Sequence, residues 1–194
     1  KAERNLSGMP NVSVASLDLM DPTSIDAFAE KFLATQQPLH LLINNAVKSN
    51  MQAVFTDCPH REKLGWLEET HLNGPGLFFN YDLSGLIPKI MQDMVDAQHV
   101  SGLVPNIAPE YVEFGGDFTD SPEWGVAVII LPWMYYEFYG DDQLLRKHFD
   151  AMKQYTEYLT SMSSDLILSH GLGDWYDYGD HAAGYAKNSP IALS

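Results

Sequence analysis

Residues 56–69 hold the densest group of side chains that could perform chemistry. The segment reads Thr-Asp-Cys-Pro-His-Arg-Glu-Lys-Leu-Gly-Trp-Leu-Glu-Glu, with four carboxylates, one arginine and one tryptophan in fourteen residues. Carboxyl groups exchange protons, an arginine orients carboxylates or hydroxyls, and an indole offers a flat apolar face to a sugar ring. The residue types fit a carbohydrate site, although a solvated ion-pair network is the more common arrangement of such residues.

Helices are expected to dominate the chain after residue 47 and to position this segment. Amphipathic patterns predict helices over residues 78–98 (broken near Gly85 and Pro88), 120–139 and 143–161. The connections over residues 101–119 and 162–190 are rich in Trp, Tyr, Asp and Gly. Loops longer than about 12–15 residues are usually functional or disordered, and this composition favours a ligand site.

Local patterns within these helices also predict caps and buried faces. Asp120-Ser121-Pro122-Glu123 is typical of a capping box, and Gly140 is a natural helix stop. Trp133 is expected in the core, among apolar neighbours on its helix. The last helix is expected to bury Leu145, Phe149, Met152, Tyr155 and Leu159.

The first part of the chain has a different pattern. Residues 11–19 alternate apolar and small polar residues as a strand does, residues 24–34 predict a helix, and residues 39–43 are a short apolar run. We therefore expect a short β-α-β unit before the helical part. The domain boundary is placed between residues 1–46 and 47–194.

Composition restricts the partners of the chain. The net charge is −15, from 26 acidic against 11 basic residues, which disfavours nucleic acid and anionic membrane surfaces. The longest apolar run, Val126–Met134, is too short for a membrane helix. The single cysteine, Cys58, excludes an intrachain disulfide, and the seven histidines lack metal-ligand spacing, so no metal is expected. Composition leaves the cellular compartment open.

Ordered motifs after residue 46 resemble the catalytic domain of bacterial α-L-rhamnosidases. The motifs are Asp57-Cys58-Pro59-His60-Arg61-Glu62, Leu72-Asn73-Gly74-Pro75-Gly76, Pro105-Asn106-Ile107-Ala108-Pro109-Glu110, Asp120–Gly125, Pro132-Trp133, Tyr139-Gly140-Asp141 and Gly173-Asp174-Trp175. Members of this family are inverting glycoside hydrolases with a helical toroid. The resemblance, with the alternation of short and long connections, implies a mainly α fold, a partial α/α toroid of the six-hairpin glycosidase type.

The resemblance also implies site residues and a substrate. Glu62 matches the general acid, which protonates the leaving oxygen, while Asp57 and Glu69 match residues that bind rhamnose hydroxyls. Further substrate-binding residues are expected to be Arg61, Trp66, Trp124, Asp174 and Trp175. The expected ligand is a rhamnose-containing glycoside, and no cofactor is needed. The family's general base lies beyond the matched region, so we expect this chain to be inactive alone, and the apolar faces of a partial toroid favour pairing with another chain.

Residues 1–46 resemble an internal fragment of a short-chain dehydrogenase/reductase. The resemblance lies in Leu17-Asp18-Leu19 and Leu42-Ile43-Asn44-Asn45-Ala46. The chain has neither a Gly-x-x-x-Gly-x-Gly loop nor a Tyr-x-x-x-Lys pair, so hydride transfer lacks its phosphate cradle and proton donor. Because of this resemblance, an NAD(P)-dependent short-chain oxidoreductase is kept as the alternative function, despite these missing motifs. A chimeric chain without enzymatic function is the third interpretation.

Overall fold

The computed structural model describes residues 22–35, 47–58, 61–175, 184 and 186–193, and the chain divides into two units, residues 1–45 and 46–194. In the first unit, helix α2 (Pro22–Ala34) matches the helix expected over residues 24–34. The rings of Phe28 and Phe32, one turn apart on this helix, stack with centroids 6.5 Å apart. The two predicted strands lie outside the described residues, so the β-α-β unit stays a prediction.

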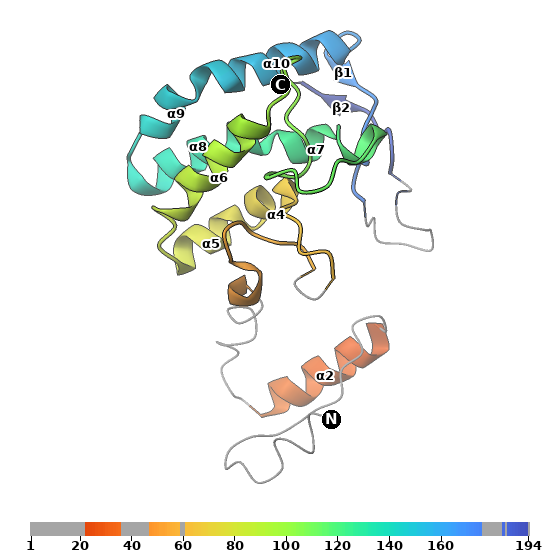
Figure 1. Ribbon diagram of the computed structural model, residues 1–194. Helices are drawn as coiled ribbons and strands as arrows, with labels where there is room; N and C mark the ends of the chain where they lie inside the picture. Colours follow the sequence, from red (N-terminus) through yellow and green to blue (C-terminus); the bar gives the residue numbers. More distant parts are fainter. Residues whose placement is uncertain (1–21, 36–46, 59–60, 176–183, 185, 194) are drawn as a thin grey trace. The chain divides into compact units, whose positions relative to one another are not determined.

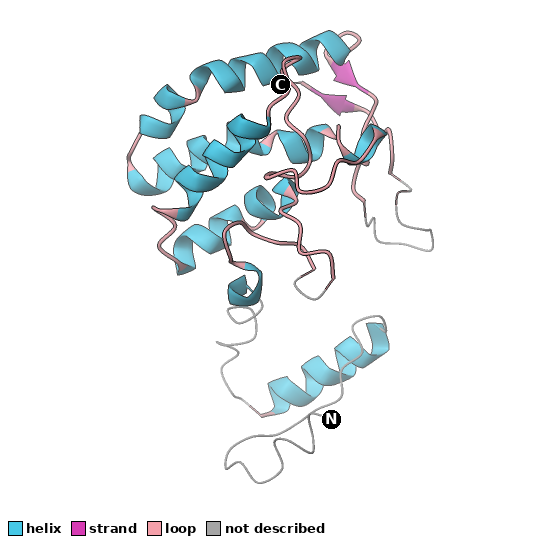
Figure 2. Ribbon diagram, in the orientation of Figure 1, coloured by secondary structure: helices cyan, strands magenta, loops and turns pink. Residues whose placement is uncertain are grey.

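The second unit is mainly helical, as the sequence predicted (Figures 1 and 2). Residues 47–50 are helical, and the further helices of its described part are α4 (Leu67–Leu72), α5 (Gly74–Asn80), α6 (Leu86–Ala97), α7 (Pro122–Gly125), α8 (Ala127–Tyr139), α9 (Gln143–Lys147) and α10 (Phe149–Met162), with a 3₁₀ turn, η1 (Gly116–Phe118). Two short strands, β1 (Ile167–Leu168) and β2 (Ile191–Ala192), pair antiparallel, with Ile167 opposite Ala192.

The helices break or end near the glycines that predicted this, and two further breaks divide helices that were predicted to be continuous. The helix expected over 78–98 is interrupted between α5 and α6, and α8 ends at Gly140, whose φ of 68° is the left-handed conformation that glycine adopts readily. Val126 separates α7 from α8, and His148 separates α9 from α10.

Helix α8 is the centre of the core and contacts α4, α5, α6, α9 and α10. Its Leu131 is fully buried, and Phe138 stacks on Phe78 of α5 with ring centroids 4.9 Å apart. Two predicted core residues are instead exposed: Trp133 is 52% exposed on α8 and Phe149 is 61% exposed at the start of α10. Helix α8 buries another face, whereas α10 buries Tyr155 and Leu159, as predicted, together with Ala151.

Six side-chain hydrogen bonds between distant described residues share a similar sequence separation, whereas the Asp120–Tyr158 bond spans 38 residues. The pairs His71–Glu123, Leu83–Tyr139, Ser84–Tyr135, Gln92–Lys147, Gln98–Ala151 and Ser121–Leu172 are all 51 to 56 residues apart. A constant separation means that successive stretches of the chain run alongside each other in the same direction. Successive helix hairpins of about fifty residues that lie side by side are the arrangement expected of a six-hairpin toroid.

None of the described helices has the length and apolar character required to cross a membrane.

Candidate active site

The motif loop, residues 57–66, folds back on itself ahead of α4. The amide of Asp57 donates to the carbonyl of Leu64 (3.1 Å), and the amide of Cys58 donates to Oδ1 of Asp57 (2.6 Å). Cys58 and Lys63 have φ angles of 46° and 56°, so the backbone turns sharply at both ends of the short stretch that carries Glu62. The turn places the Asp57 and Glu62 side chains on the same side of the loop.

Three side chains of the loop form a compact polar group. One carboxylate oxygen each of Asp57 and Glu62 and the sulfur of Cys58 lie within 4.8 Å of one another. Arg61 places Nε 3.8 Å from Oε2 of Glu62 and donates from Nη2 to the Cys58 sulfur at 2.9 Å. The positively charged guanidinium is hydrogen-bonded to the sulfur, so these three atoms are poorly suited to binding a cation. Partial burial raises the pKa of the Cys58 thiol, which disfavours a nucleophilic thiolate.

Glu68 and Glu69, in the first turn of α4, extend this acidic group. Burial, together with the neighbouring charges of Glu69, Glu123, Asp174 and Asp57, raises the pKa of Glu68 from 4.5 to about 7. Burial is also the main cause that raises the pKa of Glu69, followed by the charge of Asp57, while a hydrogen bond from Asn73 lowers it. Near neutral pH Glu68 is therefore protonated in about half of the molecules.

Glu123 faces this group from α7. Burial raises the pKa of its carboxyl, against the lowering effects of backbone hydrogen bonds and of His170. Its Oε2 is buried without a hydrogen-bond partner among the described residues, and a Cβ at Gly171 would lie 3.0 Å from it. Nε2 of His71 on α4 donates to the backbone carbonyl of Glu123 (2.7 Å), which fixes α7 against α4.

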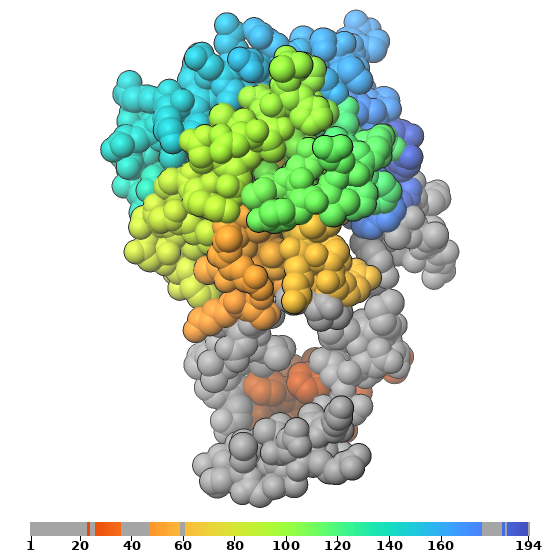
Figure 3. All heavy atoms as spheres, in the orientation of Figure 1, coloured from red at the N-terminus to blue at the C-terminus, as the bar shows by residue number. Residues whose placement is uncertain are grey.

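An aromatic cluster lies beside the acids. Trp66 stacks on Phe114 with ring centroids 5.7 Å apart and meets Phe118 and Trp124 edge-on, each at 6.4 Å. Trp175 meets Phe118 edge-on at 5.1 Å. Trp124 is only 5% exposed and supports Trp66, whereas Phe114, Phe118 and Trp175 reach the surface. Figure 3 shows the green atoms of the 101–119 segment packed across the orange and yellow atoms of residues 47–72.

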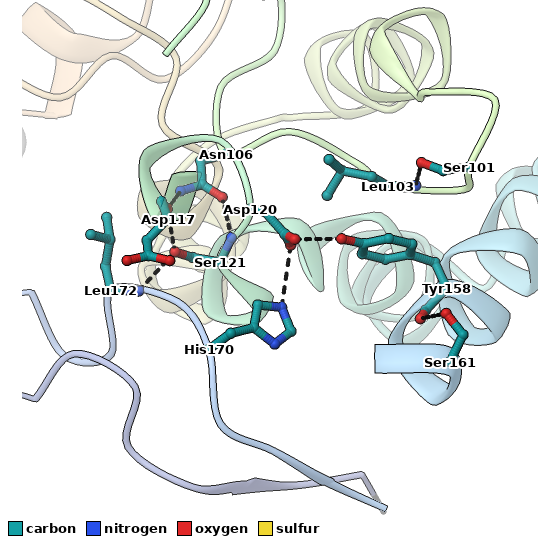
Figure 4. A network of polar contacts seen from close by, with 10 residues as sticks. All are labelled: Ser101, Leu103, Asn106, Asp117, Asp120, Ser121, Tyr158, Ser161, His170 and Leu172. Carbon is teal, nitrogen blue, oxygen red and sulfur yellow. Dashed lines mark hydrogen bonds and ion pairs between the residues drawn. The ribbon is translucent and has the colours of Figure 1, made fainter. Parts of the chain in front are cut away.

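Helix α7 is anchored differently from the expected capping box. No side-chain cap is formed at the start of α7. The Ser121 hydroxyl instead donates to the carbonyl of Asp117 (2.6 Å) and accepts from the amide of Leu172 (2.8 Å), as Figure 4 shows. Asp120 accepts a hydrogen bond from the Tyr158 hydroxyl and lies 3.3 Å from Nε2 of His170. The start of α7 is therefore held by two remote segments, α10 and residues 170–172.

The eight predicted site residues fall into an acidic group and an aromatic cluster, which adjoin along the chain at residues 66–69, 123–124 and 174–175. Arg61 forms an ion pair with Glu62, and one carboxylate oxygen of Asp57 lies within 4.8 Å of one of Glu62. The charges of Glu69 and Asp174 both act on Glu68. Trp66 meets Trp124 edge-on, and Trp175 joins this cluster through Phe118. Sequence reasoning missed Glu68 and Glu123. The adjacent acids Glu68 and Glu69 are a signal that could have identified Glu68, because two neighbouring carboxylates perturb each other's pKa. Glu123 is instead predicted from its motif to cap a helix.

The chain resembles known rhamnosidases over most of its length. The family model of the bacterial alpha-L-rhamnosidase six-hairpin glycosidase domain matches residues 34–193. An alpha-L-rhamnosidase of Formosa agariphila is 30% identical over 145 residues, which cover 71% of this chain. The chain spans only 15% of the length of that relative.

Among solved structures, the chain is also similar to bacterial alpha-L-rhamnosidases. The alpha-L-rhamnosidase from Dictyoglumus thermophilum superimposes with a TM-score of 0.61 at 33% identity, covering 65% of this chain and 14% of that one. The Streptomyces avermitilis alpha-L-rhamnosidase, complexed with L-rhamnose, gives a TM-score of 0.62 at 26% identity, covering 77% of this chain and 15% of that one.

A short segment is similar to a second family. Human retinol dehydrogenase 12 is 63% identical over 35 residues, which are 18% of this chain and 11% of that protein. This finding agrees with the dehydrogenase-like motifs before residue 47. The family match over residues 34–193, which includes every candidate site residue, establishes that the chain belongs to the six-hairpin glycosidase domain family of bacterial α-L-rhamnosidases.

Proposed function

We propose that residues 46–194 form the part of an α-L-rhamnosidase that binds the terminal rhamnose and donates the proton to the leaving group. The observation that carries this proposal is the grouping of Asp57, Arg61 and Glu62 in one loop, with the Asp57 and Glu62 oxygens within 4.8 Å and Arg61 paired with Glu62. Glu62 is the general acid. Asp57 and Glu69 accept hydrogen bonds from sugar hydroxyls, and Arg61 orients the Glu62 carboxylate.

The aromatic residues supply the apolar contact. A sugar ring has an apolar face that packs on an indole, and the exposed edge of the Trp66 cluster includes Trp175. Asp174, next in the chain to Trp175, accepts a further hydroxyl. The acidic surroundings suit a neutral ligand, because an anionic sugar would be repelled by the same carboxylates.

We further propose that the complete enzyme works by inversion and takes its general base from outside this site. An inverting pair of carboxyl groups is about 6.5–9.5 Å apart, so that a water fits between base and sugar. The Asp57 and Glu62 oxygens, within 4.8 Å, are too close for that arrangement. Asp57 therefore binds substrate and does not activate water, and we expect the 194-residue chain alone to turn over no aryl α-L-rhamnoside.

Binding of L-rhamnose tests the proposal without requiring turnover. The chain is expected to bind L-rhamnose with a Kd of about 1 mM, followed by tryptophan fluorescence or by NMR of the sugar. Asp57→Asn and Glu69→Gln should each weaken binding about tenfold by removing a charged acceptor, whereas the matched exposed change Asp150→Asn on α10 should leave it unchanged. Equal affinity of all four proteins would refute the binding site.

Turnover tests the catalytic assignment. If the chain hydrolyses an aryl α-L-rhamnoside and Glu62→Gln abolishes it, the expectation of inactivity is wrong and a base lies in this chain. NMR of the first-formed sugar then decides the stereochemistry. β-L-Rhamnose supports inversion, and α-L-rhamnose would overturn it in favour of Asp57 as a nucleophile, since retaining pairs are about 5 Å apart.

A further inference from the structure

Asn106 is a fully buried residue that none of the assigned site roles includes. Its backbone amide donates to the carbonyl of Thr119 (3.0 Å), and its carbonyl accepts from the amide of Leu67 (2.9 Å). Its side-chain Oδ1 accepts from the amide of Ser121 (2.8 Å), and its Nδ2 donates to the carbonyl of Asp117 (2.9 Å). Both polar atoms of the backbone and both of the side chain are therefore engaged with four different residues.

The partners of Asn106 belong to the separate segments that build the site. Leu67 follows Trp66 and begins α4, which carries Glu68 and Glu69. Asp117 lies in η1 next to Phe118. Next to Asn106, Ile107 bridges Trp66 in antiparallel fashion, and the amide of Ala108 donates to the carbonyl of Gly65 (3.1 Å). Gly65 and Leu67, the residues on either side of Trp66, are thus both hydrogen-bonded to the extended segment formed by residues 106–108.

Ser121 extends the junction to the last segment of the site. It is 1% exposed and lies directly before α7, which carries Glu123 and Trp124. Its hydroxyl accepts from the amide of Leu172, two residues before Asp174. Figure 4 shows Asn106, Ser121 and Asp117 converging at one point, with Leu172 reaching them from another part of the chain.

We propose that Asn106, acting through Ser121, is a positioning residue that sets the relative placement of Trp66, Trp124 and Trp175 in the proposed rhamnose site. This inference rests on the proposed function for its ligand, but the placement itself can be measured without ligand. The amide is suited to the task because it presents one donor and one acceptor in a single plane. An apolar residue here would leave the Ser121 amide buried and unpaired and would remove one of the two hydrogen bonds to the Asp117 carbonyl.

Two substitutions perturb the junction at different points. Asn106→Asp keeps the size but replaces the donor with an oxygen that faces the Asp117 carbonyl, and it adds a buried charge. Ser121→Ala adds no charge and keeps the Ser121 amide on Asn106, but it removes the hydroxyl that donates to the Asp117 carbonyl and accepts from the Leu172 amide. Asn80→Asp is the matched control: the Asn80 Nδ2 donates to the Gly76 carbonyl (2.7 Å) on the exposed face of α5.

The full chain labelled with 5-fluorotryptophan provides the readout. It has four tryptophans, and Trp133, exposed on α8 away from the junction bonds, serves as an internal reference. In ¹⁹F NMR without ligand, Asn106→Asp should shift or broaden the signals of Trp66, Trp124 and Trp175, and Ser121→Ala those of Trp124 and Trp175. The Trp133 signal should stay in place in both, and Asn80→Asp should leave all four unchanged.

The outcomes separate positioning from general stability and from the proposed function. If Ser121→Ala leaves all four signals at their original positions, or moves Trp133 as much as the others, the positioning role is refuted, even if Asn106→Asp fails to fold. Affinity for L-rhamnose should fall about tenfold or more in the folded variants. If the unmodified chain shows no response to L-rhamnose, the proposed function fails, while the ligand-free spectra still decide the role of Asn106.

Discussion

Glu68→Gln should stabilise the protein at alkaline pH and have little effect in acid. In the folded chain the pKa of Glu68 is raised from its ordinary value of 4.5 to about 7, mainly by burial. Folding therefore favours the protonated carboxyl. The stability associated with this proton is fully present below about pH 4.5 and is lost as the pH rises to about 7. Glutamine keeps the shape of the protonated acid and never acquires the charge.

The magnitude follows from the size of the shift. A change from 4.5 to about 7 would correspond to roughly 3 kcal/mol if solvent had no access, at about 1.4 kcal/mol for each tenfold change. Because Glu68 is only partly buried, solvent screening reduces this value, and we expect about 1–2 kcal/mol at pH 8. Near pH 4.5 the difference between variant and unmodified chain should fall below about 0.5 kcal/mol.

Urea unfolding followed by tryptophan fluorescence measures this difference, because all four tryptophans lie in the unit formed by residues 46–194. Glu137→Gln, an exposed change on α8, is the control and should have a small effect at both pH values. Glu123→Gln removes one charge beside Glu68 and should reduce the pH dependence. A Glu68→Gln advantage that is equal at both pH values, or a loss of stability at pH 8, would refute the electrostatic reasoning.

Four further predictions concern packing and backbone conformation and are measured as changes in the unfolding free energy. Gly125→Ala should cost about 3 kcal/mol, since its Cβ would lie 2.2 Å from the Tyr155 hydroxyl oxygen. Tyr155→Phe should be neutral or stabilising, because that hydroxyl is buried without a hydrogen-bond partner among the described residues, and it should restore part of the Gly125→Ala loss. Gly140→Ala should cost about 1 kcal/mol, from the left-handed backbone alone, as no described atom lies within 4 Å of the added Cβ. Leu131→Ala should cost about 3 kcal/mol by opening a cavity in the core, and a loss below about 1 kcal/mol would show that α8 is not its centre.

The sequence predicted features that depend on local patterns. Helix α2, the interruption between α5 and α6 and the stop at Gly140 all follow from apolar spacing and from glycine. The motif loop also brought Asp57, Arg61 and Glu62 together as expected, because they are neighbours in the chain and a short turn suffices.

Features that depend on remote partners were not predictable from local patterns. Ser121 looked like a helix cap, but its hydroxyl bonds with Leu172, 51 residues away. Glu68 acquires its raised pKa from burial and from neighbours on α7 and near residue 174. Trp133 lies on a helix that is apolar on several sides, and periodicity alone does not tell which side faces a neighbouring helix.

The regular separation of 51 to 56 residues between hydrogen-bonded segments has a consequence for how the chain folds. Closing the first loop of about fifty residues costs roughly 3.5 kcal/mol of chain entropy. Once α4 lies on α7, each later contact closes a loop of only a few additional residues. The two paired helical segments run in the same direction, so their next contacts are already close. Folding of this unit is therefore expected to be cooperative: one slow loop closure is followed by fast addition of the remaining contacts. Cutting the chain within residues 101–119 would convert that single closure into a bimolecular encounter, and folding of residues 46–194 would become dependent on protein concentration.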